Sequence, residues 1–401
     1  MLRRLLVPVA LLILALAAGI WLGGHPDRLP SPVRDALVQK DVATVGEALG
    51  ILQRRYFREP NQGKLSDAAL KAAVESLDDQ YSAFIPEKDL QAFNDTTRAR
   101  FEGIGVEIQK VTTGLKIVRV YPGSPARAAG LRADDIIVVA SGKSLAGLAT
   151  QAASTLIRGP KGTSVELTVV RGKERLTKKV RRDEVKIPIV ASHYDAKRKV
   201  GVVRLASFSE GAHGQLITAI DGVRKRGAKA LVLDLRSNPG GLVTEAQLTA
   251  GLFLKGGPVV TTRGRSVRTR TLKAGDDPRY PKMPLVVLVD RNSASASEIV
   301  TGALQDRGRA KVLGTRTYGK GVFQEIIELG SGGALDITVG QYYTPKGRNL
   351  GGAGVFKGEN VSRGKGIPPD APAVDDPATP NVDEAQDKAI AAAGRAIQAT
   401  P

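Results

Sequence analysis

The sequence predicts a fold of class α/β + β, with a helical amino-terminal region, a small β-rich module and a larger α/β core. Residues 31–97 place apolar side chains at helical spacing. Residues 98–185 contain short alternating stretches separated by glycine turns, which is typical of strands. Residues 186–375 alternate apolar runs with helical patterns, and this predicts a mostly parallel sheet. In residues 376–401 a Pro/Asp linker precedes an alanine-rich helix.

Length, cysteine content and charge narrow the class of protein. At 401 residues the chain is too long for one typical core, so we expect two or three domains. It has no cysteine, and its three histidines are too scattered to form a metal site, so neither a metal nor a cofactor is expected. The net charge of +19 suits a protein near an anionic cell envelope. Aromatic residues are few and no nucleic-acid motif occurs, so nucleic acid is not an expected partner.

The first thirty residues have the pattern of a targeting segment. Arg3 and Arg4 precede an apolar run at 5–22, a length between a signal-peptide core and a full membrane span. Ala15–Ala17 offers a cleavage site, but apolar residues follow it. We favour an uncleaved signal anchor over a cleaved signal. Either way the chain is expected to be exported to the periplasm or cell envelope, anchored in the inner membrane if residues 5–22 remain.

The helical region of residues 31–97 ends in a polar stretch. A second helix is predicted around residues 68–77, with Ser66 and Asp67 as its cap. The sequence L-D-D-Q-Y-S at 77–82 then favours a helix end and a polar turn over a metal or acid–base site. This region and the carboxyl terminus are candidates to pack on the α/β core.

The β-rich module carries three motifs in order: Gly103-Ile104-Gly105-Val106, P-G-S-P-A at 122–126 and A-G-L at 129–131. Together they resemble a PDZ domain. That resemblance implies that Gly103, Ile104, Gly105 and Val106 bind a peptide's terminal carboxylate through backbone N–H groups. The peptide would then add as a strand along a sheet edge.

The chemistry is predicted where an apolar strand at 284–290 turns into a helix through N-S-A-S-A-S. Helix amino termini present free N–H groups that suit a developing oxyanion. Ser293, Ser295 and Ser297 alternate, so their spacing alone does not choose the nucleophile, and Ser297 could instead cap the helix. No histidine lies in this stretch, so a desolvated Lys320, between two glycines, is the candidate base.

A second glycine turn, N-P-G-G at 238–241, follows the buried strand 230–235 and has the layout of an anion-holding backbone. Asp306 is expected to be a solvated charge at a helix end.

The combination of S-A-S-A-S-E with a later G-K-G-x-x-Q resembles the carboxyl-terminal processing peptidases, which are tail-specific proteases of serine/lysine type. The resemblance implies a crotonase/ClpP-like core with Ser295 as nucleophile and Lys320, 25 positions later, as base. It implies that Gln324 orients the lysine. It assigns the oxyanion hole to Ala296 and Gly241, with Gly240 left open.

The expected function is therefore that of a serine endopeptidase. It would bind apolar C-terminal tails through its PDZ domain and cleave near the C-terminus or processively. The alternative is a catalytically silent PDZ scaffold or adaptor in the cell envelope. An acyl-coenzyme A enzyme is disfavoured for an exported chain, and no S-x-x-K pattern accompanies Ser295. A homo-oligomer or an activating adaptor stays open, and residues 351–363 are longer and richer in glycine than the family pattern.

Overall fold

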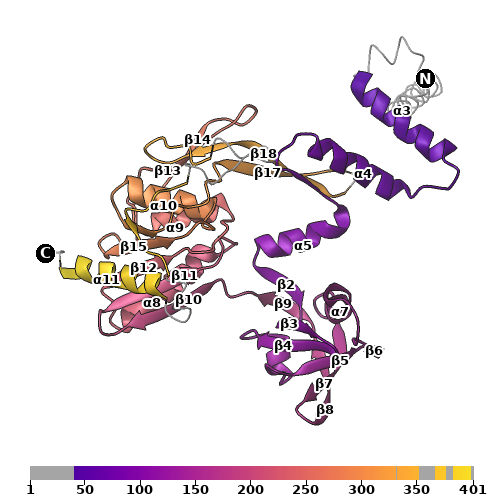
Figure 1. Ribbon diagram of the computed structural model, residues 1–401, viewed down its shortest axis with the longest axis horizontal. Helices are drawn as coiled ribbons and strands as arrows, with labels where there is room; N and C mark the ends of the chain where they lie inside the picture. The colour runs from indigo at the N-terminus through magenta and orange to yellow at the C-terminus, as the bar shows by residue number, and fades with distance from the viewer. Residues whose placement is uncertain (1–39, 331, 352–365, 376–382, 399–401) are drawn as a thin grey trace, which may run out of the picture. The chain divides into compact units, whose positions relative to one another are not determined.

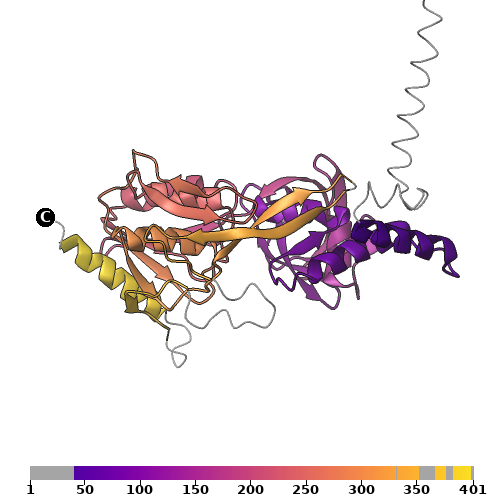
Figure 2. The same cartoon turned by 90° about the horizontal axis from the view of Figure 1, so that it is seen from above.

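The computed structural model describes residues 40–330, 332–351, 366–375 and 383–398 (Figures 1 and 2). The chain divides into two compact units, with the boundary in the sequence between Leu77 and Asp78. Among the described residues, no helix is long and apolar enough to span a bilayer. The predicted targeting segment at 5–22 lies outside them, as does most of the glycine-rich stretch.

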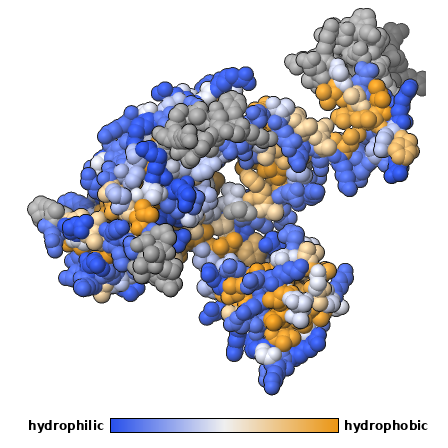
Figure 3. Space-filling view, viewed as in Figure 1, coloured by the Kyte–Doolittle hydropathy of each residue, from blue (hydrophilic) through white to orange (hydrophobic). Residues whose placement is uncertain are grey.

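The first unit contains helices α3 (Lys40–Arg55) and α4 (Gln62–Glu75). The side chain of Asn61 accepts the N–H of Lys64 at 2.9 Å and so caps α4. The predicted cap at residues 66–67 is therefore wrong, because these residues lie inside a helix that Asn61 has already started. Apolar side chains such as Val45 and Phe57 remain exposed on this unit (Figure 3).

The β-rich module is an antiparallel sheet of order β3-β4-β5-β7-β8, with β6 beside β5. Its strands are β3 (Val106–Val111), β4 (Gly114–Val120), β5 (Ile136–Ala140), β6 (Lys143–Ser144), β7 (Ser164–Arg171) and β8 (Glu174–Arg181). Helices α6 (Pro125–Ala128) and α7 (Thr150–Ile157) belong to the same module, which has an apolar core of its own. Before and after the module, β2 (Arg100–Gly103) pairs with β9 (Asp183–Lys186). Within the five-strand order, β3 pairs only with β4 and is therefore one edge of the sheet.

The α/β core contains a six-stranded sheet of order β10-β11-β12-β15-β16-β19. All of its pairs are parallel except β10 with β11. The strands are β10 (Val190–Asp195), β11 (Val200–Leu205), β12 (Ala230–Asp234), β15 (Leu285–Val289), β16 (Lys311–Gly314) and β19 (Ala371–Pro372). Strands β12 and β15 are buried at every residue, which is why their sequences are unbroken apolar runs.

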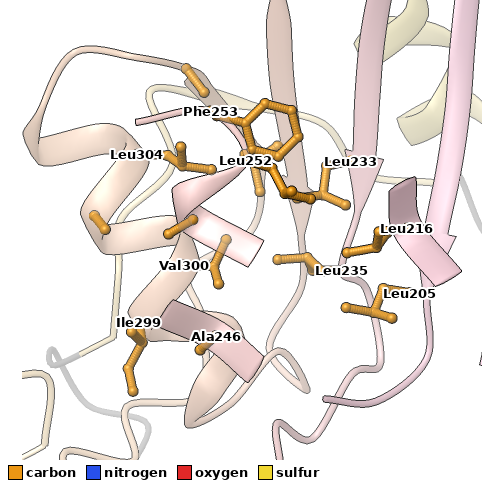
Figure 4. Close-up of a cluster of buried hydrophobic side chains, with 14 of the residues drawn as sticks. Leu205, Leu216, Leu233, Leu235, Ala246, Leu252, Phe253, Ile299, Val300 and Leu304 are labelled. Carbon is orange, nitrogen blue, oxygen red and sulfur yellow. The ribbon is translucent and has the colours of Figure 1, made fainter. Parts of the chain in front are cut away.

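Helices cover both faces of this sheet. On one face, α8 (Ala212–Lys225), α9 (Val243–Gly251) and α10 (Ala296–Asp306) pack on side chains such as Leu233 and Leu235 (Figure 4). On the other face, α11 (Glu384–Gln398) packs on the alternate residues, including Val232. The carboxyl-terminal helix thus completes the core.

A second, antiparallel sheet has the order β1-β18-β13-β14, with β17 also beside β18. Its strands are β1 (Ala83–Ile85), β13 (Pro258–Arg263), β14 (Arg270–Lys273), β17 (Val322–Glu328) and β18 (Ala334–Tyr343). The hydroxyl of Ser82 accepts the N–H of Thr338 at 3.0 Å, just before β1 pairs with β18. The chain then continues through α5 (Glu87–Thr97). Residues 78–85 therefore belong structurally to the core.

The parallel strands bring the predicted site segments to one edge. The N-P-G-G turn follows β12, the serine turn follows β15 and the lysine segment follows β16. Because parallel strands end on the same side, all three segments leave the carboxyl edge, where ligands bind in open α/β sheets.

Candidate active site

Ser295 stands at a strained turn between β15 and α10. It is the N-cap of α10 with φ 52° and ψ −114°, a backbone conformation that non-glycine residues seldom adopt. Gly240 lies against this turn, because a Cβ added to it would lie 2.7 Å from Ser295 Cβ and 2.9 Å from Ala296 N. The N-P-G-G turn and the serine turn are therefore adjacent, and the contact needs glycine at 240.

The three serines have different surroundings. Ser293 and Ser297 are fully buried, and their hydroxyls donate to the carbonyls of Leu235 at 2.8 Å and Asn238 at 2.9 Å. Ser295 is only partly buried. The suggestion that Ser297 caps the helix is wrong, because Ser295 occupies the N-cap and Ser297 instead ties α10 to the N-P-G-G turn.

A buried carboxylate connects the serine turn to the lysine segment. Glu298 is 0 % exposed, and its Oε2 accepts the backbone N–H groups of Ser295 and Lys320, both at 2.9 Å. Its Oε1 accepts the N–H of Gly319 and the hydroxyl of Thr317, both at 2.7 Å. One side chain thus holds both segments, although they are far apart in the sequence.

The charge of Glu298 follows from its partners. Burial raises the pKa of this carboxyl, while the four donors oppose the shift by stabilising the anion. These four partners all donate, as does the more distant Tyr342 hydroxyl at 3.5 Å, so the ionised carboxylate is the form that satisfies them. Glu298 was not predicted from the sequence as a site residue. Its position three residues after the helix N-cap, where a glutamate can reach back to the N-cap N–H, is the signal that could have found it.

The backbone N–H groups of the two glycines in the N-P-G-G turn differ in whether they have an acceptor. Gly240 donates to Asn238 Oδ1 at 2.9 Å, and Asn238 is itself held by a bond to the carbonyl of Leu205 at 2.9 Å. Within the described residues, no acceptor is found for the N–H of Gly241 or of Ala296. Of the two glycines that the sequence left open, Gly241 is therefore the one with a free donor.

Lys320 is half-buried among acidic groups. Burial lowers the pKa of its amine, and Asp336, Asp79 and Glu298 act in the opposite direction. Its Nζ lies 4.8 Å from the centroid of the Tyr81 ring. Burial is the largest of these effects, so the pKa lies below its ordinary value, which favours the neutral amine, the form that can accept a proton.

Gln324, the predicted partner of the lysine, lies on β17. Its amide nitrogen donates to Thr338 Oγ1 at 3.0 Å. In the described part of the chain, it makes no hydrogen bond to Lys320. The structure therefore brings the Ser295 and Lys320 segments together through Glu298, and it joins Gln324 to the neighbouring strand β18.

Tyr81 is a second residue that the sequence analysis did not assign. Asp79 Oδ1 accepts the N–H of Tyr81 at 2.9 Å, and Asp79 Oδ2 accepts the hydroxyl of Ser82 at 2.5 Å. The predicted polar turn is therefore present, and it also places an aromatic ring against Lys320. No local pattern signals this contact, because the two residues are distant in the sequence.

Asp306 is buried, whereas the sequence predicted a solvated charge. Its side chain is only 3 % exposed and pairs with Arg348, and it also accepts the N–H of Lys346 at 2.9 Å. The prediction of a solvated charge is wrong, because the segment after β18 folds back over the end of α10.

Among the residues described, no group of three or more acidic or histidine side chains could hold a metal ion.

The β-rich module has a small apolar cavity beside its edge strand. It is lined by Phe101, Ile104, Gly105, Val106, Ile108, Ser154, Ile157 and Arg158. Gly105 has φ +82°, and a Cβ added there would lie 2.3 Å from Ser124 Cβ, so this loop requires glycine. The cavity and the exposed edge of β3 together offer a place for an extended peptide.

Comparison with known proteins agrees with this architecture. Residues 199–361 match the family model of peptidase family S41, and residues 116–171 match the model of a PDZ domain. A probable CtpA-like serine protease of Staphylococcus aureus (strain MRSA252) is 36 % identical over 319 residues, which cover 79 % of this chain and 64 % of that protein. The counterpart of Staphylococcus haemolyticus (strain JCSC1435) is 34 % identical with the same coverage.

Among solved structures, the photosystem II D1 C-terminal processing protease is 27 % identical, with a TM-score of 0.48. The match covers 89 % of this chain and 98 % of that one. The chain belongs to peptidase family S41 and carries a PDZ domain. The resemblance and the fold class predicted from the sequence are thereby confirmed. The chain spans just under two thirds of the length of the staphylococcal relatives.

The role of Glu298 can be tested by Glu298→Gln. The amide group would present a donor to N–H groups that need an acceptor, which leaves buried polar groups unpaired. We expect the free energy of unfolding to fall by about 1–3 kcal/mol, measured by urea unfolding at an unchanged m-value. Glu325→Gln, the same change at an exposed position of β17, should alter it by less than about 0.5 kcal/mol. Equal stability of Glu298→Gln and the wild type would contradict the bridging role.

Proposed function

We propose that this chain is a serine endopeptidase that uses Ser295 as nucleophile and Lys320 as general base. The observation that supports this best is the shared hydrogen bonding of both backbones to Glu298 Oε2. Neutral Lys320 would take the proton of Ser295 as the hydroxyl attacks the scissile carbonyl. It would then return that proton to the leaving amine.

The free donors of Gly241 and Ala296 form the oxyanion hole of this proposal. Each would stabilise the tetrahedral intermediate, with about 3–4 kcal/mol per donor in related chemistry. Gln324 follows Lys320 by four residues, and its side-chain oxygen is the group that would orient the lysine amine. The strained turn at Ser295 supports the assignment, because strain of this kind gathers at functional sites.

Substrate selection is assigned to the PDZ domain. Backbone N–H groups of the loop from Gly103 to Val106 would capture the terminal carboxylate, and the apolar cavity would take the last side chain. The tail would add as a strand to the edge of β3. Cleavage would follow near the C-terminus or processively. We further propose that the protein works in the cell envelope after export, with residues 5–22 as its membrane segment.

Cleavage of an unfolded reporter with an apolar C-terminal tail tests this function. Wild-type chain should cleave it, and Ser295→Ala and Lys320→Ala should each lose at least a thousandfold in kcat/KM. Amidation of the tail should lower kcat/KM by about tenfold or more, because a charge-assisted carboxylate contact is lost. Ser192→Ala and Lys255→Ala, the same changes at exposed positions, serve as matched controls and should keep kcat/KM close to that of the wild type. Persistent cleavage by Ser295→Ala would eliminate the assigned nucleophile.

The pH dependence tests the surroundings of the base. The lysine must be neutral to act. The value of kcat/KM should therefore rise as the pH rises through the pKa of Lys320, and activity should be lost at pH values below that pKa. Tyr81→Ala admits water to the amine, which reduces its desolvation and raises that pKa. The acidic limb should therefore move to higher pH, with activity recovering at high pH, while Tyr81→Phe keeps the wild-type limb. An unmoved limb in Tyr81→Ala would show that the ring does not tune the base.

A further inference from the structure

Cations are concentrated at the amino edge of the parallel sheet, opposite the edge that carries Ser295. The segments that lead into β11, β12, β15 and β16 supply them. We call this group the basic edge; its members are Lys197, Arg198, Lys199, Arg224, Lys225, Arg226, Lys229, Arg279, Lys282 and Lys311. No aspartate or glutamate occurs at 196–199, 222–229 or 278–284.

Hydrogen bonds and strand register bring these segments side by side. Lys229 N–H donates to the carbonyl of Lys199 at 2.8 Å. Leu231 N–H donates to the carbonyl of Pro284, two residues after Lys282, also at 2.8 Å. Lys311 begins β16 as the partner of Val286 on β15. By this register Lys199 lies level with Lys229 and close to Lys282, whereas Lys311 lies level with Val232, three residues further along the sheet. The lysines are therefore spread over the amino-terminal ends of four adjacent strands, which lie about 4.8 Å apart.

The arginines and lysines of the basic edge differ in their partners. Arg198 pairs with Asp195 at 2.9 Å, and Arg279 and Arg224 share Asp221 at 2.7 and 3.5 Å. The six lysines are exposed, and in the described chain none of their ammonium groups has a carboxylate within 4.0 Å. No direct ion pair therefore relieves their mutual repulsion, and an anionic surface would do so.

We propose that the basic edge binds the headgroups of an anionic lipid surface. Lysine is a compact, hydrated point charge on a flexible stem, which suits a flat and diffuse array of headgroups. Nucleic acid would instead call for free arginines and exposed aromatic rings. Here two acidic residues engage three arginines, Tyr280 is buried, and Tyr194 is half-buried with the Arg226 guanidinium 5.5 Å from its ring centroid.

Binding at this edge has a consequence for orientation. The serine turn, the lysine segment and the N-P-G-G turn all leave the carboxyl edge, one strand length of about 16 Å away. A protein held by its basic edge would present that edge away from the lipid. The apolar segment at 5–22, predicted from the sequence to enter the membrane, would act together with the basic edge. Stable attachment often combines an apolar and a polybasic signal.

Vesicle flotation of the full-length chain at limiting lipid tests the proposal. The readout is the ratio of the partition coefficient on vesicles with 30 % phosphatidylglycerol to that on pure phosphatidylcholine, which cancels any uptake through the apolar segment. Each cation near such a surface contributes roughly fivefold. The variant K199Q/K229Q/K282Q/K311Q should therefore lower the ratio at least tenfold, and high salt should lower the wild-type ratio in the same way.

The matched control is K110Q/K143Q/K173Q/K179Q, which removes the same charge from exposed lysines of the β-rich module. It should keep the ratio within about twofold, and the urea midpoints of both variants should match the wild type. An equal fall in both variants would show that only net charge matters and would overturn the proposal. The proposal would also be overturned if K199Q/K229Q/K282Q/K311Q kept the wild-type ratio of partition coefficients but no longer bound a 30-base-pair DNA duplex. None of these measurements requires catalysis, so they stand apart from the proposed function.

Discussion

The arrangement of the candidate site depends on one buried anion. A carboxylate removed from water is strongly destabilising unless donors surround it. Glu298 meets this requirement with two backbone N–H groups of the Thr317–Lys320 segment, the Thr317 hydroxyl and the N–H of Ser295. Satisfying the anion therefore forces the lysine segment against the serine turn. The position of Lys320, the candidate base, relative to Ser295, the candidate nucleophile, therefore follows from the need to surround the Glu298 carboxylate with donors.

The neighbouring features carry strain and desolvation that stability alone would not favour. Ser295 has positive φ, and the Lys320 amine is partly withdrawn from water. Such features lower stability and are retained where function needs them. The rigid core beneath them, with β12 and β15 buried at every residue, can hold that strain because its packing leaves little freedom to relax.

The sequence predicted the buried strands, the helices that cover them and the segments that meet at the site, since apolar runs and glycine turns are local signals. What it missed depends on partners distant in the chain. The contact of Tyr81 with Lys320 and the pairing of Asp306 with Arg348 are of this kind. The prediction of the α4 cap was wrong for a different reason. Asn61 and Ser66 are both good capping residues, and only the backbone conformation, which is extended at Asn61, shows which one begins the helix. Of Gly240 and Gly241, Gly240 donates its N–H to Asn238, so Gly241 is the one with a free N–H among the described residues, which composition alone does not indicate.

The central claim is that Ser295 is a nucleophile activated by the neutral amine of Lys320. Its most direct test is the reaction of the folded chain with a fluorophosphonate, followed as a function of pH and mapped by peptide mass spectrometry. The account predicts one modified residue, Ser295, at a rate that rises with pH as Lys320 loses its proton. In Lys320→Met the labelling should be abolished at every pH. Modification of Ser293 or Ser297, or labelling of Ser295 at the same rate without the lysine, would contradict the account.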